Sequence, residues 1–156
     1  AAMAFGVRII RSYHDMTDPV LNLKERCDAM RKTGYEIPKI AFMPKSLADV
    51  SNLFKESQSM TNYDHILLAM GAEGLPSRIL ATHTHSYLTY VSPQEFLGNT
   101  NGIGHIDPLL LNELYNFSFL RDDIELLTIP YKAIHTVEVV SSSFFKVASD
   151  TPFNVL

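Results

Sequence analysis

The sequence predicts an α/β fold in which parallel strands alternate with helices, and two observations lead to this prediction. Short apolar runs rich in β-branched residues recur along the chain, and each is followed by a segment with apolar residues at helical spacing. Four such strand-helix units in succession imply right-handed crossovers between parallel strands, in an open doubly wound sheet or in part of an eightfold barrel. The pattern alone leaves both architectures open.

The first unit is predicted from residues 7–15, a strand rich in β-branched residues, and from a helix within residues 17–34. Asp18 is the expected N-cap, Pro19 occupies the first helical position, and Gly34 is expected to stop the helix. The spacing of the apolar residues predicts a buried helix face made of Val20, Leu23, Cys27 and Met30.

The second unit begins with a predicted strand over residues 36–44. Ser46 and Asp49 then form a Ser-x-x-Asp pattern, which predicts a capping box at the start of the next helix. The inward face of this helix is predicted to consist of Leu47, Val50, Leu53 and Phe54.

Two further units complete the pattern. The third is a strand over residues 65–71 followed by a short helix over 75–83. The fourth is a strand over residues 86–92 followed by a helix over 107–117, which Asp107 and Pro108 are expected to open. Polar residues recur near the strand ends, where both candidate architectures assemble their active sites.

Composition narrows the class of protein. The chain has 156 residues, of which 46% are hydrophobic and 19% charged, as expected for one compact domain or a large piece of one. A formal charge of −4 without a basic stripe argues against nucleic acid as a partner. The single cysteine, Cys27, and the lack of an apolar run long enough for a membrane span or signal segment favour a cytoplasmic protein without membrane contact.

Lys39 interrupts an otherwise apolar strand, and lysine is seldom buried without a partner. One interpretation is that its ammonium reaches the surface or pairs with Glu36. The other is a desolvated amine whose lowered pKa makes it a nucleophile able to form a Schiff base with a carbonyl. His14, near the end of the neighbouring predicted strand, favours the second interpretation because an imidazole can transfer the protons that imine chemistry requires.

Three motifs in order carry a resemblance to a known family. They are Ser-Tyr-His-Asp, Pro-Lys-Ile-Ala-x-Met-Pro and Met-Gly-x-x-Gly-x-x-Ser-Arg, and they lie within "IIRSYHD", "EIPKIAFMPKSLADV" and "LLAMGAEGLPSRIL". Together with "SYLTY", they resemble type I 3-dehydroquinate dehydratase, the Schiff-base dehydratase of the shikimate pathway, over roughly residues 7–115. The combination of motifs is far more specific than any one of them.

The resemblance implies a role for individual residues. Lys39 is the expected imine-forming lysine, His14 the general acid and base, and Arg78 the group that holds the substrate carboxylate. Met70 is expected to line the pocket for the substrate ring, and Ser86 is a further candidate for substrate binding. The implied reaction is the dehydration of 3-dehydroquinate to 3-dehydroshikimate, and it needs no cofactor or metal.

Two segments depart from the family pattern. A lid that usually reads close to Ser-Ala-Pro-Gly-Gln is replaced by "NTNGIGHID", which puts Asn101 and His105 where serine and glutamine contact substrate hydroxyls. His85 stands where a small residue is usual before Ser86, and with His83 it forms a His-x-His pair of the kind seen in metal sites. Without a further cluster of ligands, zinc is the minor interpretation.

The extent of the resemblance predicts the domain organisation. Residues 1–116 correspond to the C-terminal half of a (β/α)8 TIM-type barrel, and 117–156 form an extension. Such a half would leave strand edges unpaired, so we expect a homodimer or an assembly with the missing half barrel, and little activity in the isolated chain. In some members the dehydratase is fused to shikimate dehydrogenase, which the extension resembles faintly, although no Gly-x-Gly-x-x-Gly fingerprint occurs.

Two other functions remain open from the sequence. One is an inactive remnant or binding module that keeps the half barrel without a complete site. The other is a class I aldolase-like Schiff-base lyase, which also uses a barrel lysine, although the order of the motifs argues against it.

Overall fold

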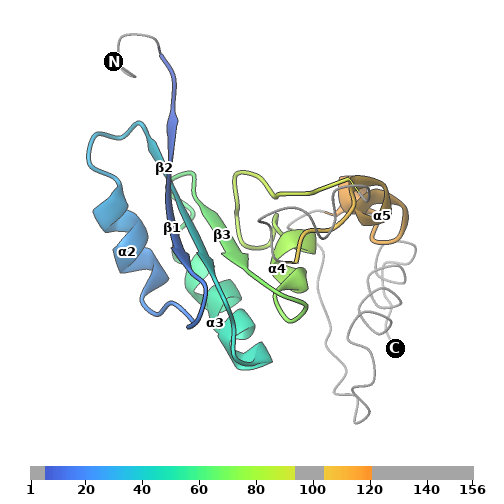
Figure 1. The fold of residues 1–156 in the computed structure, drawn as a ribbon. Coiled ribbons are helices and arrows are strands. Elements are labelled where there is room, and N and C mark those ends of the chain that lie inside the picture. The colour runs from blue at the N-terminus through green and yellow to red at the C-terminus, as the bar shows by residue number, and fades with distance from the viewer. Residues whose placement is uncertain (1–5, 94–103, 121–156) are drawn as a thin grey trace. The chain divides into compact units, whose positions relative to one another are not determined.

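The computed structural model describes residues 6–93 and 104–120, and the chain divides into two units, 1–89 and 90–156. The first unit contains a sheet of three parallel strands in the order β1 (Ile9–Asp15), β2 (Glu36–Phe42) and β3 (Ile66–Ala69) (Figure 1). Each strand is followed by a helix, namely α2 (Leu23–Met30), α3 (Leu47–Ser57) and α4 (Leu75–Ile79). The predicted α/β class, the parallel sheet and the first three strand-helix units are therefore confirmed.

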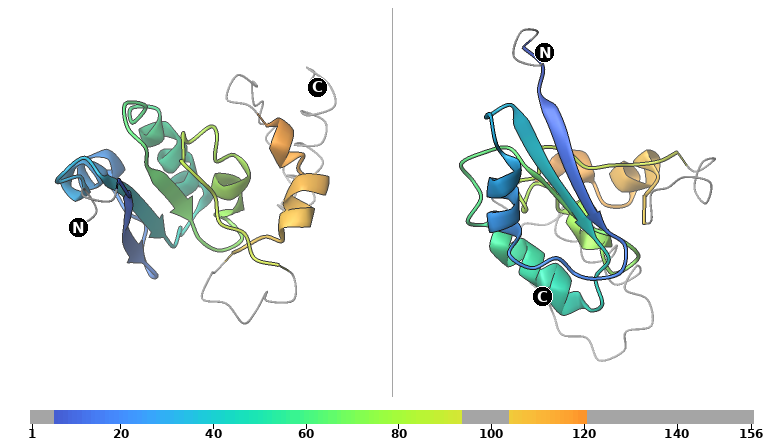
Figure 2. Two further views of the ribbon diagram at one scale, coloured as in Figure 1. Left: turned by 90° about the horizontal axis from the view of Figure 1, so that it is seen from above. Right: turned by 60° about the vertical axis from the view of Figure 1, so that its left-hand side comes forward.

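One face of the sheet is covered by α2 and α3, which Figure 2 shows on the same side of the strands. Residues of β2 and β3 that alternate along the strands point into this core, where they meet the apolar faces of the two helices. The core consists of Val20, Leu23, Cys27, Ile40, Phe42, Val50, Leu53, Met60, Leu67 and Ala69, with Met30 and Phe54 packed against it. These two helices leave the opposite face of the sheet uncovered.

Helix α3 begins at the predicted position, but one residue that was predicted to lie in its core face is exposed. The Ser46 N–H and hydroxyl both donate to Asp49 Oδ2, at 2.9 and 3.1 Å, within the capping box. Leu47 is 46% exposed, so the prediction that it faces inward is wrong. Leu47 is the first residue of the helix, whereas Val50 and Leu53 further along are buried.

Helix α2 begins later than predicted. Its N-cap is Asn22, in the left-handed region with φ 57°, rather than Asp18, and Pro19 precedes the helix. The carboxylate of Asp18 forms an ion pair with Lys45 instead. The helix ends at Met30, and Gly34, with φ 84°, lies in the following turn, so the predicted stop is four residues too late.

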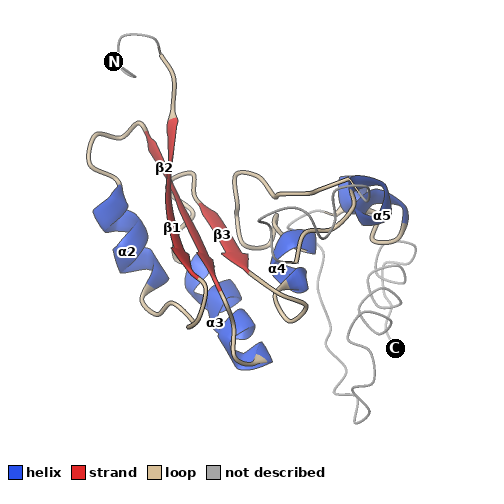
Figure 3. Ribbon diagram, viewed as in Figure 1, coloured by secondary structure: helices blue, strands red, loops and turns tan. Residues whose placement is uncertain are grey.

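The predicted fourth strand over residues 86–92 is absent from the described part of the chain (Figure 3). Ser86 forms only an isolated parallel bridge with His65. The serine hydroxyls of Ser86 and Ser77 occupy the edge of β3 instead, because the N–H groups of Leu67 and Ala69 donate to them at 3.1 and 2.9 Å. Side chains thus satisfy backbone groups that a longer neighbouring strand would otherwise satisfy.

The second unit contains α5 (Pro108–Glu113), a short 3-10 helix at Phe117–Phe119, and a bridge between Val91 and Ile106. Asp107 is the N-cap of α5, as predicted, since its Oδ1 accepts from the N–H groups of Leu109 and Leu110. Of the predicted extension, residues 121–156 lie outside the described part of the chain. The described helices include none that is long and apolar enough to cross a membrane.

Strand β1 forms one edge of the sheet. Ile9, Ile10 and Tyr13 are exposed on it, in contrast to the buried side chains of β3. Within the described residues, β1 pairs only with β2. An exposed apolar edge of this kind is suited to pairing with a further strand, and the half-barrel stays a prediction.

Candidate functional site

The strand register places His14 and Lys39 on the same face of the sheet. Ile40 of β2 points into the helix-covered core, so its neighbours Lys39 and Ala41 point to the other face. His14 is in register with Ala41, and Ser12 with Lys39. Registered neighbours in a parallel pair share a face, and the imidazole of His14 therefore stands on the same side as the amine of Lys39.

Lys39 has the properties expected of a nucleophilic amine. Its side chain is half-buried in the middle of β2. Desolvation and, secondarily, the charge of Arg78 lower its pKa from the usual value of 10.5. Alternation along the strand puts Glu36 on the opposite face, where its carboxylate accepts from the N–H and hydroxyl of Thr33. A lowered pKa increases the share of neutral amine available for attack.

His14 is exposed near the end of β1. Desolvation and, secondarily, the charge of Lys39 lower its pKa from the usual value of 6.5, which favours the neutral imidazole. A neutral imidazole can accept a proton. Because His14 lies on the same face as Lys39, it is a candidate proton acceptor for a molecule bound to that amine.

Arg78 is a third basic residue, and it is coupled electrostatically to this pair. It belongs to α4, is 2% exposed, and acts electrostatically on Lys39. Burial lowers the pKa of its guanidinium to about 10, which still leaves it charged near neutral pH. The three groups form an electrostatic series, because Arg78 lowers the pKa of Lys39 and Lys39 lowers that of His14. Such a cluster of basic groups is suited to an anionic ligand.

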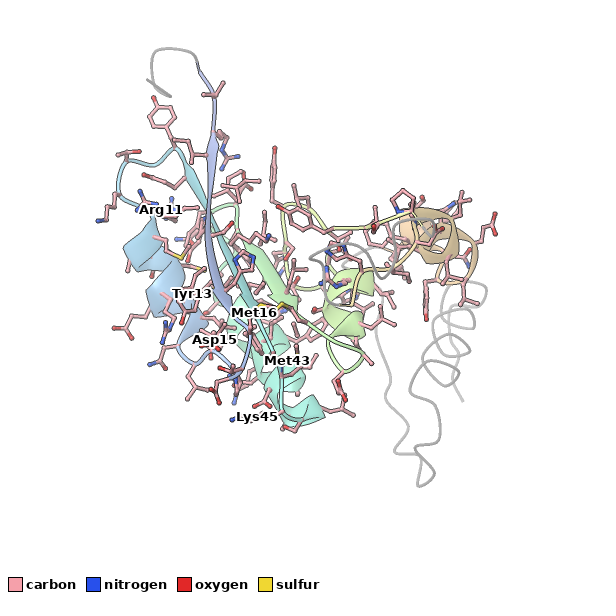
Figure 4. The ribbon with its side chains drawn as sticks, viewed as in Figure 1. Arg11, Tyr13, Asp15, Met16, Met43 and Lys45 are labelled. Atoms are coloured by element: carbon pink, nitrogen blue, oxygen red, sulfur yellow. The ribbon has the colours of Figure 1, made fainter. Side chains whose placement is uncertain are left out.

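A methionine follows each strand of the sheet, namely Met16, Met43 and Met70. The backbone ladder continues to these positions, since the Met43 N–H donates to Asp15 O at 2.9 Å and the Met70 N–H to Phe42 O at 2.8 Å. Continued alternation places the methionines on the face that carries the amine and the imidazole. Figure 4 shows Met16 and Met43 at this end of the strands. Met70 is buried, as a lining residue would be, and its predicted contact with a substrate ring stays a prediction.

The loops after β1 and β2 are joined by contacts that the sequence did not reveal. Asp15 Oδ1 accepts from the Thr17 N–H at 3.1 Å, the Thr17 hydroxyl at 3.0 Å and the Asp18 N–H at 2.9 Å. These hydrogen bonds lower the pKa of the Asp15 carboxyl. The carboxylate of Asp18 pairs with Lys45 of the next loop. Figure 4 labels Asp15 and Lys45, which belong to the two segments that this pair joins. The only sequence signal was the aspartate directly after His14, a residue type that caps tight turns.

For the other predicted site residues, the structure gives at most a location and no evidence of a role in binding. The Ser86 hydroxyl accepts from the N–H of Leu67, so it lies at the edge of β3. His105 belongs to the second unit, and Asn101 lies outside the described residues. The predicted binding roles of these three residues stay predictions. Among residues 6–93 and 104–120, His83 and His85 belong to no group of three or more potential metal ligands.

A comparison with known protein families matches residues 1–122 to the family model described as type I 3-dehydroquinase. A 3-dehydroquinate dehydratase of Methanosarcina mazei is 33% identical over 88 residues, which cover 54% of this chain and 36% of that relative. The chloroplastic bifunctional 3-dehydroquinate dehydratase/shikimate dehydrogenase of Arabidopsis thaliana is 32% identical over 129 residues, or 81% of this chain and 21% of that protein.

Solved structures give the same result for the fold. The 3-dehydroquinate dehydratase of Aquifex aeolicus has a TM-score of 0.59 at 26% identity, covering 74% of this chain and 50% of that structure. The type I 3-dehydroquinate dehydratase of Clostridium difficile, solved with covalently modified comenic acid, has a TM-score of 0.61 at 26% identity, covering 75% and 46%. This chain thus spans half the length or less of the relatives described.

Proposed function

This chain belongs to the type I 3-dehydroquinase family, and we propose on that basis that it carries the Schiff-base site of a 3-dehydroquinate dehydratase, a hydro-lyase of the shikimate pathway. The observation that supports the proposal most directly is the half-buried Lys39, whose pKa is lowered by desolvation and by the charge of Arg78, and whose own charge lowers the pKa of His14. An imine-forming lysine, an acid-base group and a carboxylate-binding cation are the three functions that this dehydration requires.

The proposed reaction begins at Lys39. Its neutral amine attacks the ketone carbon of the substrate, and loss of water from the adduct gives an iminium ion. The iminium acidifies the neighbouring C–H bond, from which His14 removes a proton to form an enamine. The enamine then expels the hydroxyl group one carbon further on, which His14 protonates so that it leaves as water. Hydrolysis of the resulting conjugated iminium frees Lys39 and the unsaturated product.

Arg78 is proposed to orient the substrate through its carboxylate. A planar guanidinium binds a carboxylate with two parallel hydrogen bonds, and burial strengthens this pairing because water competes less. The burial of Arg78 and its electrostatic effect on Lys39 support this role. A bound carboxylate would also counter the charge that Arg78 exerts on the amine.

The remaining parts of the site are proposals from the family. Met70 would line the ring pocket, Asn101 and His105 would contact substrate hydroxyls, and Ser86 would be a further substrate-binding residue. We further propose that strands beyond the exposed edge of β1 complete a (β/α)8 barrel, either from a missing half or from a second copy. The same proposal includes the cytoplasmic localisation inferred from composition, and residues 117–156 as a degenerate or truncated start of a shikimate dehydrogenase domain.

Borohydride trapping tests the proposed nucleophile. The sample is a chimera in which the half of the Aquifex aeolicus relative that this chain does not cover is joined to it, so that the barrel can close. Incubation with 3-dehydroquinate and borohydride is expected to leave a reduced adduct on the peptide that contains Lys39, detected by mass spectrometry. Lys39→Met keeps the apolar stem and is expected to abolish the adduct. The isolated chain is expected to be trapped weakly or not at all.

The position of the adduct decides the outcome. Trapping on Lys45 would contradict the assignment, because Lys45 is exposed and paired with Asp18. A folded chimera that gives no adduct on Lys39 would favour the inactive remnant or binding module. An adduct on Lys39 without release of product would favour a different Schiff-base reaction.

A further inference from the structure

The hydroxyl of Ser77 connects the end of β3 to the start of α4. It accepts from the Ala69 N–H at 2.9 Å and donates to the Gly74 carbonyl at 2.7 Å. Ser77 has no exposed surface, so water cannot replace either bond. One buried hydroxyl therefore joins the last residue of the strand to the first turn of the helix.

A second feature fixes the same junction. A Cβ atom added at Gly74 would lie 2.2 Å from the Ala69 carbonyl oxygen, so the backbones of the helix start and the strand end approach directly. Helix α4 has five residues, Leu75–Ile79, and a helix this short depends on tertiary contacts for its position. Gly74 permits the close approach of the two backbone segments, and the hydrogen bonds of the Ser77 hydroxyl stabilise it.

Arg78 directly follows Ser77 in the chain, and both side chains are buried. We propose that Ser77 is a positioning residue, which acts through the β3–α4 junction to hold the Arg78 guanidinium beside Lys39. The inference rests on the proposed function for the role of Arg78 in carboxylate binding. It also gives a reason for the Gly-x-x-Ser-Arg part of the third motif. The glycine permits the close backbone approach, the serine hydroxyl links helix to strand, and the arginine provides the cation.

The experiment must separate positioning from a purely structural role. Ser57 supplies a matched control, because it is also fully buried and its hydroxyl donates to the carbonyl three residues earlier, Phe54 O, at 2.7 Å. Ser57 lies on α3, away from Arg78 in the chain. Ser77→Ala and Ser57→Ala are therefore compared, and Ser77→Thr, which keeps a hydroxyl able to bond the same carbonyl, is the rescue variant.

Two measurements on the ligand-free full chain report on Arg78. The first is the NMR signal of the Arg78 Nε–H group, identified by its loss in Arg78→Lys, and its rate of exchange with water. The second is the titration of the Lys39 Cε signal. With Ser77→Ala we expect faster Nε–H exchange and a Lys39 titration midpoint moved upward, since the guanidinium no longer stays beside the amine. Ser77→Thr and Ser57→Ala are expected to retain the wild-type values.

The proposal is overturned if Ser77→Ala and Ser57→Ala lower the melting temperature alike while both Arg78 measurements stay unchanged. If Ser77→Ala does not fold, Ser77→Cys replaces it, since a thiol of similar size is a weak donor and acceptor. Faster Arg78 Nε–H exchange and a higher Lys39 titration midpoint are then expected in smaller degree, and their absence would equally overturn the proposal. Binding of cyclohexanecarboxylate to the wild-type protein tests the proposed role of Arg78 separately, so failure there is distinguishable from failure of the positioning role.

Discussion

His14 and Lys39 stand on one face of two adjacent parallel strands, because His14 is in register with Ala41, two residues beyond Lys39. Their proximity has an electrostatic consequence, since the charge of Lys39 contributes to the lowered pKa of His14. The neutral form of the imidazole, which can accept a proton, is therefore favoured partly by the amine that it is proposed to assist. The relationship can be tested without substrate.

The first prediction follows from this relationship. Lys39→Met removes the charge and keeps the apolar stem, so the pKa of His14 is expected to rise toward its usual value of 6.5. Desolvation is the larger cause of the shift, and a part of it is expected to remain. The measurement is an NMR titration of the His14 ring protons. Lys45→Met is the control, because Lys45 pairs with Asp18, and it is expected to leave His14 unchanged.

The second prediction concerns Arg78. Arg78→Lys keeps a positive charge but loses the forked geometry, so substrate binding by the chimera is expected to weaken by roughly 1–3 kcal/mol. The Michaelis constant is expected to rise more than the turnover number falls. An unchanged Michaelis constant would remove Arg78 from the carboxylate site.

The sequence predicted the fold most accurately where local pattern and burial agree. Buried residues such as Leu23, Cys27 and Leu53 follow from helical spacing, and the capping pattern at Ser46 was sufficient to locate the start of α3. The start of α2 could not be predicted in this way, because Asp18 has a tertiary partner in Lys45, which local pattern does not reveal. Tertiary contacts override local preferences at such points.

The missing fourth strand has a similar cause. Residues 86–92 have an apolar alternating pattern, but a strand forms only where its backbone groups find partners. The Ser77 and Ser86 hydroxyls already bind the backbone at the edge of β3. For the candidate site, the sequence predicted Lys39, His14 and Arg78 individually, and the structure adds the register that puts His14 and Lys39 on one face and the electrostatic effect of Arg78 on Lys39.

The third prediction tests the core between the sheet and α3. Leu53 has no exposed surface, whereas Leu47 on the same helix is 46% exposed. Leu53→Ala is expected to lower the free energy of unfolding by about 2–5 kcal/mol, because it leaves a cavity in the core. Leu47→Ala is the matched control, and its effect is expected to stay within roughly 0.5 kcal/mol. Urea denaturation followed by circular dichroism measures both.

The fourth prediction concerns the dependence of stability on pH. Hydrogen bonds from Thr33 lower the pKa of Glu36 below 4.5 in the folded chain. The folded state therefore binds fewer protons than the unfolded state just below pH 4.5, and stability falls as the pH falls through that range. Glu36→Gln is expected to destabilise the chain at pH 7, and the difference from the wild type is expected to shrink in acid. Urea midpoints at several pH values measure this, with exposed Glu25→Gln as the control.

The last prediction assigns the proton transfers. In the chimera, His14→Ala leaves the amine of Lys39 and the cation of Arg78 in place, so substrate is still expected to bind and form the imine. Turnover is expected to fall by roughly 10²–10⁴-fold, since no positioned group then removes the proton next to the iminium carbon or protonates the departing hydroxyl. Borohydride trapping and steady-state kinetics on the same sample separate the two steps. Trapping that persists while turnover is lost would assign His14 to proton transfer, whereas near-normal turnover would assign that role to another residue. Loss of both would instead mean that His14 is needed to form the imine, and the proposed division of labour between His14 and Lys39 would be wrong.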